Sequence, residues 1–168
     1  MTGMIEFISI PRERIKILKN DRKAVDKLEN LSETKIKFNE EVSIESEDVL
    51  KILRVKEVVK SFGRGFELED ALNLLDEEYY LETIDIKEFS GKSRNRMITL
   101  KGRVIGEKGK TKKLIEKYAD VKISIYGKTI GIIGKWNTIM IAKKAIEMLL
   151  LGSLHSTIYK FLEKNRMR

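Results

Sequence analysis

The fold is indicated most clearly by the residues Val104-Ile105-Gly106-Glu107-Lys108-Gly109-Lys110-Thr111-Lys112-Lys113, in which two glycines flank two polar residues between one helical pattern and the next. Glycine is needed where a backbone must approach another chain closely, since any Cβ would intrude there. The residues after Gly109 begin a helix, and the free N–H groups and positive dipole end of a helix attract a phosphate. Lysines on both sides add counter-charge. The stretch therefore predicts a clamp for a phosphodiester backbone.

The elements expected around this stretch follow an order that also occurs in the first half of the chain. In the second half, the hydrophobic patterns predict a strand at 83–89, helices at 94–105 and 110–119, strands at 122–126 and 129–133, a long helix at 137–151 and a last helix from 154 onward. In the first half, they predict a strand at 5–10, helices at 12–18 and about 25–31, strands at 35–38 and 42–45, a long helix that follows an N-cap at 48 and stops near 63–65, and a connecting helix at 68–80. The repetition indicates two related domains, a first at 1–80 and a second at 81–168. We expect an α+β protein.

Charge is distributed unevenly between the two halves. The chain carries a net charge of +8. Residues 1–84 hold 14 Lys and Arg against 19 Asp and Glu, whereas residues 85–168 hold 20 against 7. A solvated, lysine-rich surface is the alternative explanation, but this imbalance favours a polyanion that meets the C-terminal half.

Composition argues against several other functions. The chain has no cysteine and one histidine, His155, so it offers neither a thiolate nor a His-only metal site, and we expect no metal and no cofactor. The Gly-Lys-Thr and Gly-Lys-Ser tripeptides lack the earlier glycine of a nucleotide-binding P-loop. No apolar run has the length of a membrane span and no signal peptide is evident, which favours a cytoplasmic protein.

The motif in this setting resembles a known RNA-binding module. Ile105-Gly106-Glu107-Lys108-Gly109 between two helices, followed by a strand hairpin and a long helix, resembles the type I KH domain. Such a domain clamps about four nucleotides along their backbone. The resemblance implies two tandem type I KH domains, each with a three-stranded antiparallel sheet packed against three helices, and an extra C-terminal helix. It also implies that the strand after the motif forms the other wall of the groove, so that Lys122 and Ile123 lie near the bases. Core packing is the alternative role of that isoleucine.

The candidate RNA-binding residues follow from the motif, from the bases around it and from this implied wall. They are Arg103, Ile105, Gly106, Glu107, Lys108, Gly109, Lys110, Lys112, Lys113, Lys122 and Ile123. Glu107 lies inside the motif and weakens phosphate binding, so the neighbouring lysines must outweigh it.

The whole chain is also similar to one family, the pre-ribosomal KH proteins called partner of Nob, in its short archaeal form. The segments that carry this similarity are 8–15, 66–72, 102–109, 124–129 and 152–163. The resemblance implies binding to the 3′ end of small-subunit ribosomal RNA during subunit maturation. It further implies contact with the endonuclease that trims that end.

The first half departs from the motif. Asn20-Asp21-Arg22-Lys23 stands where the glycines are expected, without glycine and with an added acid. We therefore interpret the first domain as a structural or protein-contact module. The expected function is single-stranded RNA binding without catalysis, in ribosome assembly and rRNA processing. The alternatives are a general KH adaptor in RNA turnover or translation and, less favoured, an RNA-cleaving enzyme, for which the sequence shows no metal cluster and no acid–base pair.

Overall fold

The structure is a computed structural model, and it describes residues 3–166. The chain divides between Tyr79 and Tyr80 into two compact units, the first unit and the second unit. Each unit contains a three-stranded sheet and several helices, so the expected α+β class is confirmed.

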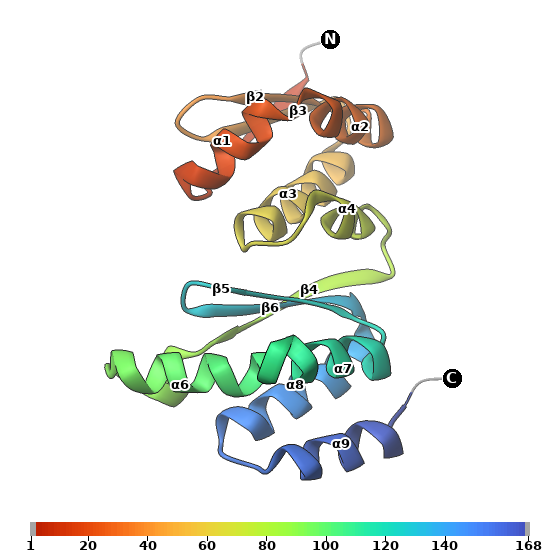
Figure 1. Ribbon diagram of the computed structural model, residues 1–168. Helices are drawn as coiled ribbons and strands as arrows, with labels where there is room; N and C mark the ends of the chain where they lie inside the picture. The colour runs from red at the N-terminus through yellow and green to blue at the C-terminus, as the bar shows by residue number, and fades with distance from the viewer. Residues whose placement is uncertain (1–2, 167–168) are drawn as a thin grey trace. The chain divides into compact units, whose positions relative to one another are not determined.

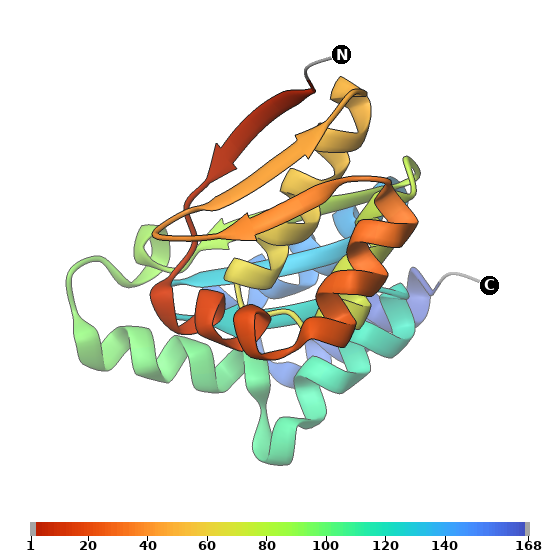
Figure 2. The same cartoon turned by 90° about the horizontal axis from the view of Figure 1, so that it is seen from above.

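The first unit builds its sheet from strands that are not in sequence order. Its elements are β1 (Met4–Ile8), α1 (Arg12–Asn20), α2 (Arg22–Ser32), β2 (Lys35–Phe38), β3 (Val42–Ser46), α3 (Val49–Gly63), α4 (Leu68–Ala71) and the 3-10 helix η1 (Leu72–Leu75). The strand order is β1-β3-β2, and both pairings are antiparallel. The helix α3 packs against β1 and β3, and Figure 2, which looks down on this sheet, shows the strands running over it.

The second unit contains the same arrangement with additional helices. Its elements are β4 (Tyr79–Asp85), α5 (Lys87–Ser90), α6 (Arg94–Ile105), the 3-10 turn η2 (Glu107–Gly109), α7 (Lys110–Ala119), β5 (Lys122–Tyr126), β6 (Thr129–Lys135), α8 (Trp136–Leu150) and α9 (His155–Lys164). The strand order is β4-β6-β5, and β5 pairs antiparallel with β6 in a register that places Ile123 opposite Ile132. Figure 1 shows α6, α7 and α8 on one face of this sheet. The last helix, α9, packs on α7 and α8.

Apolar residues from the sheet and the helices form the core of the second unit. Ile84, Ile123 and Ile132 of the sheet pack with Leu100 and Val104 of α6 and with a row of α8 residues. These α8 residues are Ile139, Ala142, Ala145, Ile146 and Leu149. Because α6 and α7 both contribute residues to this core, their packing positions the junction between them at the surface of the unit.

Two expected boundaries were wrong. A helix was expected from Leu68 to Tyr80, but α4 and η1 end at Leu75 and β4 has begun at Tyr79. The Asp76 carboxylate accepts a hydrogen bond from the backbone N–H of Glu78 at 2.9 Å, which turns the chain and ends the helical segment. The second wrong boundary is the end of the strand expected at 83–89. β4 ends at Asp85, whose carboxylate accepts a hydrogen bond from the N–H of Lys87, and Phe89 lies in the short helix α5.

None of the helices within residues 3–166 combines the length and the apolar character needed to cross a bilayer.

Candidate nucleic-acid interface

The junction between α6 and α7 is a tight loop with an unusual backbone. Gly106 has φ 76° and ψ 173°, Lys108 has φ 53° and Gly109 has φ 76°. Three of the four residues from Gly106 to Gly109 therefore have positive φ, a region that glycine enters freely and that a lysine enters at a cost. The loop closes with a 3.2 Å hydrogen bond from the N–H of Gly109 to the carbonyl of Gly106.

The two glycines are required for different reasons. A Cβ on Gly106 would lie 2.1 Å from Oγ1 of Thr111 and 2.6 Å from its Cβ, so Gly106 is required by packing inside the unit. A Cβ on Gly109 would meet nothing closer than the end of the Lys113 side chain at 3.9 Å. Gly109 therefore leaves open space at the surface, where a backbone of another chain can approach.

The start of α7 offers positive charge to an anion. Gly109 is the N-cap residue, and it has no side chain that could cap the helix, so the N-terminal dipole end faces the loop. Lys108, Lys110 and Lys113 are exposed and Lys112 is half-buried. Glu107 is exposed as well, as the one acid inside the loop. Four lysines and a helix N-terminus therefore surround one carboxylate, and the local field favours a phosphate.

The side chain of Arg103, which was expected among the RNA contacts, makes hydrogen bonds inside the unit. Its Nε donates to the carbonyl of Leu149 at 3.0 Å, and a terminal guanidinium nitrogen donates to the carbonyl of Ser153. The guanidinium thus ties the end of α6 to the end of α8 and to Ser153 beyond it.

The expected place of the Ile123 side chain at the groove needs correction. Only 4% of Ile123 is exposed and it belongs to the core of the second unit, so its side chain has the alternative role, core packing. The alternation along β5 turns Ile123 inward and leaves its neighbour Lys122 exposed. Ile105, in contrast, is 38% exposed, so its side chain is accessible to a ligand.

Two further positions on α6 face solvent, and the motif alone did not identify them. Ile98 is 61% exposed, and a Cβ on Gly102 would have open space around it. Ile98, Gly102 and Ile105 are spaced by four and three residues on α6, so they share one face of the helix. Leu100 and Val104 form the buried face. A second apolar row on the solvent side of α6 was the sequence signal that could have identified this exposed face.

The equivalent junction in the first unit is different. A single residue, Asp21, separates α1 from α2, and its carboxylate accepts a hydrogen bond from the N–H of Ala24 at 3.1 Å. A carboxylate therefore already occupies the N-terminal end of α2, the position where α7 is open. A phosphate there would meet the negative charge of Asp21.

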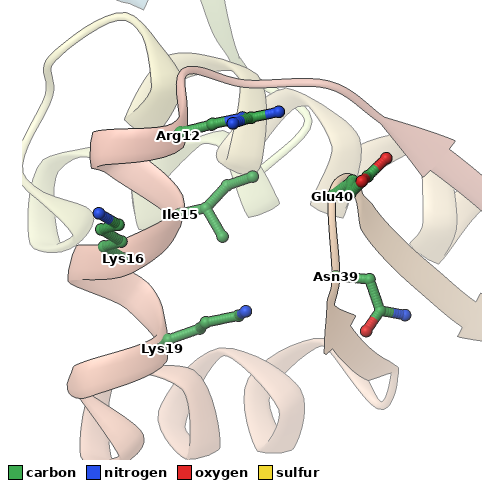
Figure 3. A pocket seen from close by; sticks show the side chains of 6 residues that line it. All are labelled: Arg12, Ile15, Lys16, Lys19, Asn39 and Glu40. Carbon is green, nitrogen blue, oxygen red and sulfur yellow. The ribbon is translucent and has the colours of Figure 1, made fainter.

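The first unit nevertheless has a cleft lined by cations, which the charge balance did not indicate. Figure 3 shows Arg12, Ile15 and Lys19 of α1 across an opening from Asn39 and Glu40. The cavity has a volume of about 440 Å³, and Lys16 also lines it. A second cavity of about 350 Å³ shares Lys19 and Asn39 with it and adds Arg22 and Lys37. The net charge of residues 1–84 combines all surfaces of the first unit, so it did not reveal that these cations gather on one of them.

Within residues 3–166, no group of three or more histidine, aspartate or glutamate side chains is arranged to hold a metal ion.

Comparisons of this chain with known proteins agree on one family. The family model that matches residues 80–167 describes the second KH domain of PNO1, a eukaryotic-type KH domain (KH-domain type I). A KH domain-containing protein of Methanocaldococcus jannaschii is 37% identical over 98% of this chain and 75% of its own length. The pre-rRNA-processing protein pno1 of Schizosaccharomyces pombe is 33% identical over 66% of this chain, which spans 46% of that relative.

A solved structure agrees with these relatives. A chain in the crystal structure of the a/eIF2alpha–aDim2p–rRNA complex from Pyrococcus horikoshii OT3 has a TM-score of 0.85 and 37% identity, with 96% of this chain and 93% of that chain covered. The family model covers the unit with the Gly106–Gly109 loop, and the relatives and the solved structure extend the match to the first unit. The chain therefore belongs to the PNO1 family of type I KH-domain proteins.

Proposed function

We propose that this protein binds single-stranded RNA at the 3′ end of small-subunit rRNA, as a ribosome assembly and rRNA-processing factor. The observation that carries the proposal is the Gly106–Gly109 loop, which opens onto the uncapped start of α7 among exposed lysines. Relatives named as pre-rRNA-processing proteins and a similar chain solved in a complex with rRNA support it.

The second unit recognises backbone and bases with separate surfaces. Phosphates lie against Gly109 and the start of α7, where Lys108 and Lys110 neutralise their charge. Bases lie along the exposed face of α6, where Ile98 and Ile105 offer apolar contact and Gly102 leaves room. Phosphate contacts determine how tightly a strand is held, and base contacts determine which strand is preferred.

The proposal is tested by measuring the affinity of the full chain for a short RNA with the 3′-end sequence and for a scrambled RNA of the same composition. We expect tighter binding of the 3′-end sequence. Equal affinities with a normal salt dependence would favour the alternative, a general KH adaptor in RNA turnover or translation. A chain that bound neither RNA would contradict both functions.

We propose that the protein has no catalytic activity. The endonuclease that trims the 3′ end is the proposed protein partner, with the first unit as its contact surface, and both proteins would act on the cytoplasmic subunit. Incubation of short RNA with this protein and divalent metal ions is expected to leave the RNA intact. Cleavage that depends on the metal, in the absence of other proteins, would contradict this part of the proposal.

The first unit contributes less to RNA binding in this proposal. We call the cleft lined by Arg12, Lys16 and Lys19 the first cleft. Asp21 occupies the start of α2, so an RNA strand in the first cleft has no free helix N-terminus to hold its phosphate. Arg12, Lys16 and Lys19 still attract an anionic chain through their side chains. The first cleft therefore adds weak, salt-sensitive attraction, and the second unit supplies the clamp.

A further inference from the structure

The last helix, α9, contacts both helices that flank the Gly106–Gly109 loop. Nε2 of His155 donates to the carbonyl oxygen of Arg103 at 3.0 Å, in the last turn of α6. The hydroxyl oxygen of Tyr159 lies 3.1 Å from Oγ1 of Thr111, in the first turn of α7. His155 and Tyr159 are four residues apart, so they share one face of α9, and their ring centroids are 6.3 Å apart.

The contact with α6 satisfies a group that the helix cannot satisfy itself. The carbonyl of Arg103 is among the last four of α6, which have no partner within the helix. His155 supplies its donor, and the guanidinium of Arg103 binds the carbonyls of Leu149 and Ser153 in return. The end of α6 is thus bonded to the α8–α9 connection through main chain and side chain together.

The contact with α7 acts directly beneath the loop. Thr111 is 1% exposed, and its hydroxyl fills the space where a Cβ of Gly106 would stand. The position of that hydroxyl determines how closely Gly106 can approach α7. Tyr159 bonds this same hydroxyl, so it helps to fix the packing under the first residue of the loop.

The loop needs such support because its backbone is strained. Lys108 adopts a positive φ, and conformations of this kind persist where the surroundings determine them. The helix α9 can provide this support because Ile158 and Leu162 anchor it, both completely buried in the core.

We propose that His155 and Tyr159 are positioning residues for the phosphate clamp, holding the Gly106–Gly109 loop in the conformation that accepts the RNA backbone without touching the RNA themselves. The inference rests on the proposed function, since it takes this loop to be the clamp. Apparent affinity falls with the fraction of molecules in which the loop is competent to bind.

The test uses the full chain with Tyr159→Phe, which removes one hydroxyl and keeps the ring, and with His155→Phe, which removes the donor. Single-strand affinity is expected to fall about three- to fivefold for each variant and about tenfold for the pair. Without RNA, the amides of residues 106–110 should exchange with solvent at least about threefold faster, while the core amides keep their rates. His155→Gln restores a donor and should recover part of the affinity. Tyr80→Phe, which removes a hydroxyl on β4, is the matched control and should change neither quantity.

The salt dependence separates positioning from direct contact. Tyr159→Phe removes no charge, so the slope of log K against log salt should stay at the wild-type value. Loop exchange and affinity that both match the wild type in the two Phe variants would overturn the proposal. Weaker binding with unchanged loop exchange would also overturn it, because the residues would then contact RNA directly. Faster loop exchange with unchanged affinity would overturn it as well, and Lys108→Asp then decides independently whether the loop binds RNA.

Discussion

The α1–α2 junction of the first unit and the α6–α7 junction of the second occupy equivalent places in the order of elements and differ in what lies at the helix start. In the first unit the carboxylate of Asp21 caps α2. In the second, Gly109 begins α7 without a side chain. The first arrangement stabilises its own helix by about 1 kcal/mol. In the second, no side chain caps α7, so its free N–H groups can bind an external anion. The comparison shows that a helix N-terminus is available to an anion only where no side chain of the protein already caps it.

Reversal of charge at Lys108, in the α6–α7 junction, should cause the largest loss of RNA affinity. In Lys108→Asp, two adjacent carboxylates would lie on the phosphate path, and we expect RNA affinity to fall by at least about 30-fold. Because Lys108 is exposed, the free energy of unfolding should change by less than about 1 kcal/mol. Affinity is measured by fluorescence anisotropy and stability by urea titration.

The matched control for that variant is Lys23→Asp, an exposed lysine at the start of α2. Asp21 already excludes phosphate from this end, so a further acid should leave RNA affinity nearly unchanged. A folded Lys108→Asp protein that binds normally, or a Lys23→Asp protein that loses binding to the same extent, would contradict the division of roles between the two junctions.

Gly106→Ala should have the second largest effect, through structure and not through charge. The new Cβ would collide with Thr111, so we expect a loss of about 2 kcal/mol in the free energy of unfolding and about tenfold weaker RNA binding. Gly109→Ala meets open space and should cost about 1 kcal/mol, from its positive φ alone. Thermal and urea unfolding of both variants checks the order. Equal losses would show that crowding beneath Gly106 is relieved by movement of Thr111.

The sequence predicted much of the second unit because its signals are local. The glycines, the alternating strands and the amphipathic helices each report their own conformation, and α6, β5 and α8 lie within a residue of their expected bounds. The role of Arg103 was not predictable in this way. Its partners are backbone carbonyls 46 and 50 residues further along the chain, and a carbonyl carries no signature in sequence.

Ile123 and the first cleft show two further limits of sequence patterns. Strand alternation gave two possible faces for β5, and only pairing with β6 places Ile123 opposite Ile132 in the core. The cations of the first cleft are spaced along α1 with Arg12, Lys16 and Lys19 on one side, but net charge over 84 residues hid them. Helical spacing of charged residues is therefore more informative than their total.

Removal of single lysines near the loop should have a moderate effect that salt reveals. If three or four phosphates are neutralised, log K should fall against log salt with a slope of roughly −2 to −3 for a single strand. Lys112→Ala or Lys113→Ala should each reduce the magnitude of this slope by about 0.7 and weaken the 3′-end and scrambled RNAs equally, because phosphate contacts carry no sequence information. RNA titrations at four salt concentrations measure this slope for each variant. A wild-type slope near zero would show that the strand is held by stacking, without a phosphate clamp.

The smallest effect is expected in the cleft of the first unit. Lys16→Gln with Lys19→Gln removes two charges from this cleft, the same charge change as removing Lys112 and Lys113 together. Because Asp21 occupies the helix end, these lysines act on an anion only through mobile side chains in water, where each attraction is screened. We expect the pair to weaken RNA binding by less than about twofold at 0.15 M salt and somewhat more at low salt. The paired Lys112 and Lys113 variant, measured beside it at each salt concentration, should lose several times more. Equal losses would show that the cleft of the first unit holds the strand as firmly as the Gly106–Gly109 loop, and that an open helix end is not required for RNA binding in this chain.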